Sequence, residues 1–390
     1  MSDHTQEYDV IVVGGRVAGA ATAMLLARRG HRVLVVDQEQ PGRDTLSTHA
    51  LMRPGVLQLQ RWGLLEDVIA AGTPPVSTVT FRYADDPIVV DVEHPLYAPR
   101  RTVLDPIVVA SARRAGAEFR YGVRVERVLR DQHGRVSGVA GRGPLGERFT
   151  ARGRVTVGAD GSRSLVARAV HAPVTRTAPS ASAVIYGYWS GVDASGYEWC
   201  FDVERSAGVM PTNDGLTCVW VSAPAAHMRP LMRGDREQSV SALLEQTSPD
   251  LARRVRAGRR EGVLRGAMNT VPNLTRRAWG AGWALVGDAG QHTDPLTALG
   301  ISNALRDAEL LADGLHASLR DPRDEAAALA AYERARDERS DDLFAVSTVI
   351  SSLRWDLAEA QRQHLILSRA LQRDARAIMA LDGELTGVAG

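Results

Sequence analysis

Hydrophobic residues in the first part of the chain follow the pattern of a strand, a turn, a helix and a second strand. Residues 9–13 (DVIVV) are a short β-branched apolar run, typical of a strand buried on both faces. Residues 14–19 (GGRVAG) predict a tight turn, and residues 20–29 carry Ala, Leu and Met at helical spacing. Residues 32–36 (RVLVV) predict a second buried strand. Together they predict one βαβ unit of a parallel sheet.

The turn of this unit has the features of a dinucleotide site. Asp37 follows Gly14 by 23 residues, close to the spacing of about 20 at which a carboxylate reaches a ribose hydroxyl. A turn that opens a helix offers unpaired N–H groups and a positive dipole end to a pyrophosphate. Arg16 occupies the second glycine position of G-x-G-x-x-G. Either Gly15 supplies the clearance one residue early, or Arg16 adopts a negative φ and turns its side chain away. An ordinary βαβ crossover without a ligand is the alternative.

The next stretch predicts antiparallel strands around one helix. Residues 76–92 alternate and carry turn residues, and residues 101–115 read as a helix. Residues 119–128 and 135–140 predict a hairpin pair. Residues 141–146 (GRGPLG) spell G-x-G-x-x-G, but strand-like residues follow them, so we interpret them as a hairpin turn.

Two further stretches repeat the order of buried strand, small-residue turn with one aspartate, and helix. Residues 154–157 run into GADGSRS, which contains Asp160. Residues 283–286 run into GDAG, which contains Asp288, and a helix is expected over residues 304–319. Small residues around a single carboxylate permit close approach of a ligand.

The region between these turns lacks βαβ units. Residues 182–223 predict antiparallel strands, residues 235–257 a helical interval, and residues 325–381 helices with a break near Ser351. We therefore predict an α/β fold with a Rossmann-like parallel-sheet domain, an antiparallel-sheet substrate domain and C-terminal helices. The predicted boundaries are 1–75, 100–180 and 270–345 for the first domain, 76–99 and 181–269 for the second, and 346–390 for the C-terminal helices.

Composition narrows the function classes. The chain has 390 residues and is 44% hydrophobic and 24% charged. Its formal net charge is +1, so the overall electrostatic field does not favour binding to nucleic acid. No apolar run reaches about 18 residues and the N-terminal residues are polar, so we expect neither a membrane span nor secretion. Only two cysteines, Cys200 and Cys218, are present, which fits a reducing cytoplasm. We expect no metal site, and the sequence does not indicate the oligomeric state.

GGRVAG with Asp37, then GADGSRS, then GDAGQHTDPLTALGISNAL together resemble the FAD-dependent monooxygenases of the para-hydroxybenzoate hydroxylase type. The resemblance implies a glutathione-reductase-like FAD fold. It also implies NAD(P)H as a transient reductant, although the preference between NADH and NADPH cannot be read. Gln291, His292, Thr293 and Leu299 depart from the more Gly-rich loop of many members.

Position by position, the resemblance implies a set of FAD contacts. The glycine turn would hold the pyrophosphate, Asp37 the adenosine ribose, and Asp288 the ribityl hydroxyls. The helix that follows Pro295 would direct its dipole at the flavin ring. The full implied set is Gly14, Gly15, Val17, Ala18, Gly19, Asp37, Gln38, Arg53, Arg101, Val125, Asp160, Gly161, Gly287, Asp288, Pro295, Gly300 and Ile301.

The implied function is a single-component monooxygenase that uses NAD(P)H and O₂ to hydroxylate an electron-rich, aromatic small molecule through a C4a-hydroperoxyflavin. Tyr186 and Tyr188 are two apart on an expected strand and so share a face; with His49 they are the predicted catalytic residues. The alternatives are a reductase of the geranylgeranyl type and a non-catalytic flavin-binding module. A flavin halogenase is set aside because those enzymes are thought to need a lysine, and all 47 basic residues of this chain are arginine.

Overall fold

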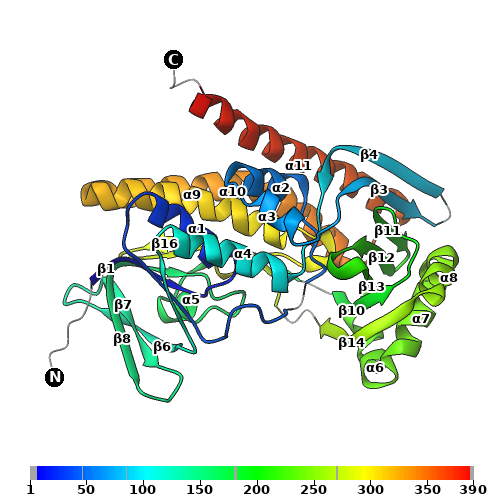
Figure 1. The fold of residues 1–390 in the computed structure, drawn as a ribbon, viewed down its shortest axis with the longest axis horizontal. Coiled ribbons are helices and arrows are strands. Elements are labelled where there is room, and N and C mark those ends of the chain that lie inside the picture. The colour runs from blue at the N-terminus through cyan, green and yellow to red at the C-terminus, as the bar shows by residue number, and fades with distance from the viewer. Residues whose placement is uncertain (1–6, 46, 85, 180–181, 269–270, 387–390) are drawn as a thin grey trace.

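The computed structural model describes residues 7–45, 47–84, 86–179, 182–268 and 271–386. A mainly parallel sheet with helices, an antiparallel-type sheet and two long C-terminal helices make up the molecule (Figure 1). This arrangement confirms the predicted fold class. The domain boundaries at 180–181 and 269–270 lie outside the described residues, so the division into domains stays a prediction.

The first sheet has eight strands in the order β16-β17-β8-β1-β2-β5, with β7 and β6 attached antiparallel beside β8. Its strands β17, β8, β1, β2 and β5 run parallel. Val10, Val12 and Val35 are fully buried, as expected of strands covered on both faces. The strands are β1 (Glu7–Val13), β2 (Val33–Asp37), β5 (Glu118–Tyr121), β6 (Arg124–Arg130), β7 (Val136–Arg142), β8 (Arg148–Gly158), β16 (Trp279–Gly280) and β17 (Trp283–Leu285).

The second sheet has seven strands in the order β14-β10-β13-β12-β11-β3-β4. Its two faces differ because side chains alternate along a strand. Tyr186, Trp199 and Trp220 join the core shared with the first sheet, whereas Ile185 and Val219 pack under the helices of residues 225–257. The strands are β3 (Val76–Tyr83), β4 (Asp86–Leu96), β10 (Ser182–Ser190), β11 (Tyr197–Asp202), β12 (Arg205–Pro211), β13 (Leu216–Pro224) and β14 (Arg259–Met268). A small third sheet contains β9 (Val174–Ala178), β15 (Asn273–Arg276) and β18 (Gln291–His292).

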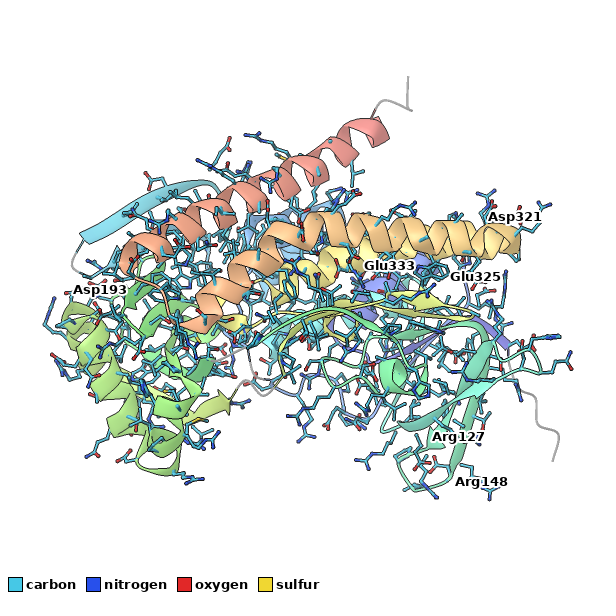
Figure 2. All side chains as sticks on the ribbon, turned by 180° about the vertical axis from the view of Figure 1, so that it is seen from behind. Arg127, Arg148, Asp193, Asp321, Glu325 and Glu333 are labelled. Carbon is cyan, nitrogen blue, oxygen red and sulfur yellow. The ribbon has the colours of Figure 1, made fainter. Side chains whose placement is uncertain are left out.

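Helices cover both sheets. α9 packs against α1 and α10, and α11 packs against α10 and α2. Figure 2 shows α10 and α11 crossing the back of the molecule, with Glu325 and Glu333 on α10 facing the first sheet. The helices are α1 (Val17–Arg28), α2 (Arg53–Arg61), α3 (Leu65–Ala70), α4 (Arg101–Arg114), α5 (Leu165–Ala169), α6 (Ala225–Arg233), α7 (Arg236–Thr247), α8 (Pro249–Ala257), α9 (Gly300–Arg320), α10 (Glu325–Ser352) and α11 (Leu357–Thr386).

Three local predictions need correction. The stretch 119–128 is not one strand of a hairpin, because Phe119 lies in β5 and pairs in parallel with Val35 of β2. β11 pairs in parallel with β3, so the second sheet is not wholly antiparallel. α9 begins at Gly300 and not at Ala304. The two strand pairings depend on contacts between residues distant in sequence, which local periodicity does not contain.

Other local predictions are confirmed. Residues 143–147 form the turn between β7 and β8, so GRGPLG does not open a helix. The expected break near Ser351 falls between α10, which ends at Ser352, and α11. None of the helices in the described part of the chain combines the length and apolar character that a membrane span requires.

Candidate functional site

A cavity of about 900 Å³ opens where the carboxyl ends of the parallel strands meet the second sheet. This edge of a parallel sheet is where ligands usually bind in such folds. Most of the residues expected to bind a cofactor line it. Those that do are Gly14, Val17, Ala18, Asp37, Gln38, Arg101, Val125, Asp160, Gly161, Asp288, Pro295, Gly300 and Ile301, joined by His49 and Tyr186.

Two glycines set the close packing of the turn after β1. Gly14 has φ +106°, and a Cβ there would lie 2.3 Å from the carbonyl oxygen of Ala159. A Cβ on Gly19 would lie 1.9 Å from the carbonyl oxygen of Gly14. Neither position accepts a side chain without moving backbone atoms. The turn, the start of α1 and the end of β8 therefore form one compact cradle beside the cavity.

Gly15 and Asp37 are joined directly. The Gly15 N–H donates to Asp37 Oδ2 at 2.6 Å, and the Glu39 N–H donates to Oδ1 at 2.8 Å. The Asp37 carboxylate is thereby fixed at the end of β2 and lines the cavity. Gly15 and Gly19 do not line the cavity; they shape the turn whose other residues do.

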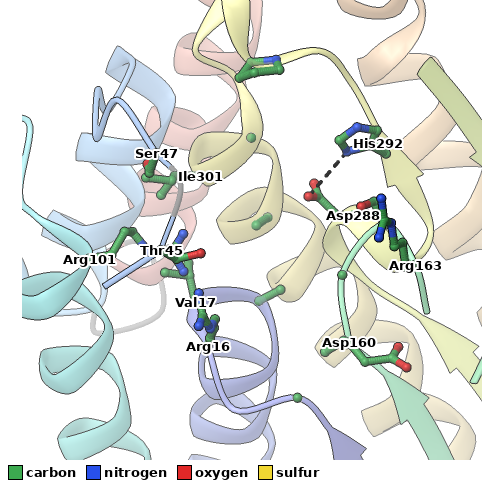
Figure 3. Close-up of a pocket in the computed structure, with 18 of the residues that line it drawn as sticks. Arg16, Val17, Thr45, Ser47, Arg101, Asp160, Arg163, Asp288, His292 and Ile301 are labelled. Atoms are coloured by element: carbon green, nitrogen blue, oxygen red, sulfur yellow. Dashed lines mark ion pairs between the residues drawn. The ribbon is translucent and has the colours of Figure 1, made fainter. Parts of the chain in front are cut away.

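The conformation of Arg16 agrees with only half of the second expectation, that it adopts a negative φ and turns its side chain away. Its φ is −91°, as expected for a residue that fits without strain, but its side chain lines the cavity and does not turn away. Figure 3 shows it beside Val17, at the start of α1. The chain thus adds a guanidinium to the anion-attracting end of this helix.

We expect Arg16→Ala to weaken FAD binding about tenfold, because a charge-assisted hydrogen bond contributes about 1.5 kcal/mol or more. The dissociation constant is measured by flavin fluorescence at low and high salt, and the loss should shrink in high salt. Arg148→Ala, at the far end of the β7–β8 hairpin (Figure 2), is the matched control and should bind FAD normally. Equal affinity for Arg16→Ala and wild type would show that Arg16 does not contact the cofactor.

Asp160 organises the second turn. Its Oδ1 accepts from the Ser164 hydroxyl at 2.5 Å, and its Oδ2 accepts from the N–H groups of Leu165 at 2.6 Å and Val166 at 3.2 Å. Asp160 therefore supports the start of α5 while lining the cavity. Gly161, with φ +78°, makes the turn that follows.

Asp288 faces His292 across the third turn. Asp288 is about half exposed, and its Oδ2 lies 3.4 Å from Nδ1 of His292 (Figure 3). Burial by itself lowers the pKa of His292, but the hydrogen bond and charge of Asp288, with the charge of Asp294, raise that pKa above its ordinary value. Gly287 lies outside the lining and packs its turn against Ala18 of α1. From the sequence, His292 stood out only because it departs from the Gly-rich loop of many family members. Its i,i+4 spacing from Asp288 is the signal that could have identified the pair.

Besides the three glycines already described, Arg53 and Tyr188 lie outside the cavity lining. Arg53 begins α2, and its guanidinium pairs with Glu93 of β4 at 3.3 Å. Tyr188 lies behind the lining, next to His49. A direct flavin contact for Arg53 is therefore not supported by its position.

His49 and the two tyrosines form one buried cluster. The Nε2 of His49 lies 2.5 Å from the Tyr188 hydroxyl, and the two rings stack at 5.8 Å. Tyr186 packs edge-on at 6.5 Å, and its hydroxyl donates to the Thr45 carbonyl at 3.2 Å. His49 has a φ of +69°, which is unusual for a residue other than glycine and indicates a constrained backbone.

The cluster stays uncharged. Burial, together with the charges of Arg101, Arg100 and Arg265, lowers the pKa of His49 to about 3. Burial raises the pKa of Tyr186 to about 12 and raises that of Tyr188 further. These side chains therefore present neutral polar groups at neutral pH.

The low pKa of His49 predicts acid sensitivity. In the unfolded state His49 binds a proton near pH 6.5, whereas in the folded state it binds one only near pH 3. The free energy of unfolding therefore falls as pH falls through this range. Between pH 6.5 and 5 we expect wild type to lose about 1–2 kcal/mol more than His49→Gln. Urea unfolding of the holoprotein at both pH values measures this, with the exposed His133→Gln as a control that should behave as wild type. Parallel pH dependence in wild type and His49→Gln would contradict a neutral buried His49.

The second sheet supplies a wall that sequence reasoning largely missed. Its side chains come from four neighbouring strands, and of these only Tyr186 was expected. The alternation along β11, β12 and β13 identifies one shared face, but not that this face borders a cavity. We call this set the sheet wall; it consists of Ser182, Val184, Tyr186, Trp199, Met210 and Trp220.

In the described part of the chain, no three His, Cys, Asp or Glu side chains come together in a way that could hold a metal ion. The cavity instead fits a dinucleotide. It combines a glycine cradle that a Cβ would fill, the N-terminus of α1, carboxylates at the strand ends, and the N-terminus of α9. The residues present therefore fit FAD.

Comparisons with known proteins agree with this geometry. The FAD binding domain family matches residues 7–347. Aklavinone 12-hydroxylase RdmE of Streptomyces purpurascens is 34% identical over 189 residues, 43% of this chain and 35% of its own length. The chain thus spans about a third of that relative.

Two other similar proteins cover more of the chain. Digeranylgeranylglycerophospholipid reductase of Methanocella arvoryzae is 25% identical over 328 residues, 77% of this chain and 75% of the relative. A structure of the flavin-dependent brominase Bmp2, a triple mutant, superposes with a TM-score of 0.81 at 19% identity, covering 98% of this chain and 99% of the brominase. The second likeness shows the fold alone.

Proposed function

We propose that this chain, which belongs to the FAD binding domain family and is an FAD-dependent oxidoreductase, is a single-component monooxygenase that hydroxylates an electron-rich aromatic molecule with NAD(P)H and O₂. The observation that carries the proposal is the neutral aromatic cluster of His49, Tyr186 and Tyr188 at the cavity. It supports a phenol-binding pocket, because neutral hydrogen-bonding groups suit an uncharged hydroxyl.

The protein holds FAD along the strand ends. Gly14 and Gly19 allow the turn to approach the pyrophosphate, and the N-terminus of α1 with Arg16 attracts its charge. Gly300 and Ile301 begin α9, whose positive dipole end faces the cavity and stabilises negative charge. When bound, FAD supplies electron transfer from NAD(P)H and activation of O₂.

The substrate side supplies orientation and a polar contact. The sheet wall excludes water from one side of the cavity and presents aromatic faces to a ring. His49 lines the cavity, and its Nδ1 is buried and has no hydrogen-bond partner within the described residues. We assign this atom to the substrate hydroxyl. Because the pKa of His49 is low, the neutral imidazole accepts a hydrogen bond from the hydroxyl and leaves the proton on the substrate.

Product analysis under isotopically labelled O₂ tests the proposal. The holoprotein should consume NAD(P)H faster with a phenol present and place one labelled oxygen in the product. His49→Gln and Tyr188→Phe should lower the turnover number about 100-fold while keeping FAD bound. A flavin that is never reduced by NAD(P)H would contradict the proposal and leave a non-catalytic flavin-binding module.

A second candidate is an FAD-dependent reductase of an isoprenoid chain. The apolar sheet wall and the similarity to the archaeal reductase over 77% of this chain favour it. This reaction needs no O₂ and leaves a saturated bond in place of an alkene. Anaerobic turnover with an isoprenoid alcohol would therefore support the reductase. A halogenase is disfavoured because the chain contains no lysine.

A further inference from the structure

The charges that line the cavity are distributed unevenly. None of the six sheet-wall residues carries a charge, although they come from four strands of the second sheet. The charged lining residues all come from the opposite side, at the strand ends and helices of the first sheet. These are Arg16, Asp37, Glu39, Arg101, Arg124, Asp160, Arg163, Arg168 and Asp288.

Two polar groups of the sheet wall, the hydroxyls of Ser182 and Tyr186, already have partners, whereas the Trp220 Nε1–H is buried and has none within the described residues. The Ser182 hydroxyl donates to Asp294 Oδ2 at 2.6 Å. The Tyr186 hydroxyl donates to the Thr45 carbonyl and accepts from the Ser47 N–H at 3.3 Å. A carboxylate placed against this wall would lose its water and gain no cation in return.

The three arginines whose charges act on His49 are also engaged. Arg101 lines the cavity, as Thr45 and Ser47 do (Figure 3). Its Nε and Nη2 donate to the two carboxylate oxygens of Asp105 at 2.7 and 3.0 Å. This bidentate pair engages Nε and Nη2 and neutralises the charge, so a substrate carboxylate would have to compete with Asp105 for the guanidinium. Arg100 and Arg265 each place one Nη2 near the same oxygen of Asp44, at 3.5 and 3.1 Å, and Arg100 Nη1 also lies 3.5 Å from Asp214.

The rings of the wall favour a planar ligand. Trp199 stacks on Phe81 at 5.5 Å and Tyr197 packs on it edge-on at 5.5 Å, so its ring is held in one orientation. Met210 lies on the neighbouring strand β12, and Trp220 lies on β13, the strand after that. Fixed aromatic faces and a polarisable thioether bind a flat ring system through stacking and sulfur contacts.

We infer that the substrate is an uncharged, planar, fused-ring aromatic that carries a hydroxyl, and that the sheet wall excludes aromatic carboxylates. The inference rests on the proposed monooxygenase function and specifies its substrate class. The specificity-determining residues are Trp199, Met210 and Trp220, and His49 receives the hydroxyl.

Equilibrium binding to the oxidised holoprotein tests the class without turnover. The probes are naphthol, hydroxynaphthoate and farnesol, followed by the change in flavin absorbance and by quenching of tryptophan fluorescence. Naphthol should bind at least 100-fold more tightly than hydroxynaphthoate and more tightly than farnesol. Similar or tighter binding of hydroxynaphthoate overturns the exclusion of carboxylates. Tighter binding of farnesol, or no binding of naphthol, overturns the aromatic class.

A charge placed in the wall should reverse the preference. Met210→Arg is expected to bind hydroxynaphthoate at least tenfold better than wild type and naphthol less well, whereas Met210→Leu should keep the wild-type order. If Met210→Arg fails to fold, the three wild-type affinities still decide the question. Labelled O₂ separates the two proposals. Oxygenated hydroxynaphthoate would refute the substrate class and leave the reaction standing, whereas naphthol that binds without being oxygenated would refute the reaction.

Discussion

Replacing Gly14 by alanine is expected to give a protein that retains little FAD and unfolds more readily than wild type. The new Cβ would lie 2.3 Å from the Ala159 carbonyl oxygen, and the residue would have to keep a φ of +106°. Left-handed strain and overpacking together predict a loss of about 3–5 kcal/mol. Because the displaced atoms form the cradle, the FAD dissociation constant should rise at least 100-fold.

Gly30→Ala is the matched control. Gly30 also has a positive φ, +82°, but no atom lies within 4 Å of the position of its Cβ. It should lose about 1 kcal/mol from backbone strain alone and bind FAD as wild type does. Flavin content after gel filtration and thermal unfolding measure both effects. A Gly14→Ala protein with full flavin content would show that the turn does not hold the cofactor.

The second large effect concerns ions buried between α9, α10 and α11. Arg306 is 2% exposed, and its Nη2 donates to Asp307 Oδ1 at 2.8 Å and to the Ser340 hydroxyl at 2.9 Å. Its Nη1 lies 3.7 Å from Asp374 of α11. Arg306→Met would leave two buried carboxylates short of a cation, which predicts a loss of about 3–5 kcal/mol.

The pH dependence of this variant identifies the cause. Burial raises the pKa of Asp307 even in wild type, although the charges of Arg306 and Arg336 oppose the rise. Without Arg306 that pKa rises further, so the folded variant binds a proton that the unfolded chain releases. The deficit relative to wild type should therefore shrink as pH falls. Arg323→Met, in an exposed pair with Asp321, is the matched control and should leave stability unchanged. A deficit that is constant with pH would assign the loss to packing alone.

The central strands of the parallel sheet could be predicted from short local stretches of the sequence. Short apolar runs ending in Gly14, Gly158 and Gly287 predicted the three strands that meet at the cavity, because fully buried strands need no alternation. The pairing of β5 with β2, and of β11 with β3, could not be predicted. Those partners are separated by some 80 and 120 residues, and nothing in their own alternation selects a neighbour.

The site residues also fall into two groups, those with a local sequence signal and those that only the fold brings together. Glycines and aspartates at strand ends carry a local signal, and the structure gathers most of them around one cavity. The spacing of Tyr186 and Tyr188 predicted a shared face, but the contact of Tyr188 with His49 across 139 residues follows only from the fold. Trp199, Met210 and Trp220 were missed because an apolar residue in a strand has the same pattern whether it meets a core or a cavity.

The measurement that tests the central claim most directly is the anaerobic reduction of the purified flavoprotein by NADPH or NADH, with and without naphthol. The absorbance spectrum must first show bound flavin. We predict that the flavin band bleaches at least tenfold faster with naphthol, and that no such increase occurs with hydroxynaphthoate. A colourless protein that does not take up FAD, or a flavin whose reduction is unaffected by any aromatic ligand, would contradict the account.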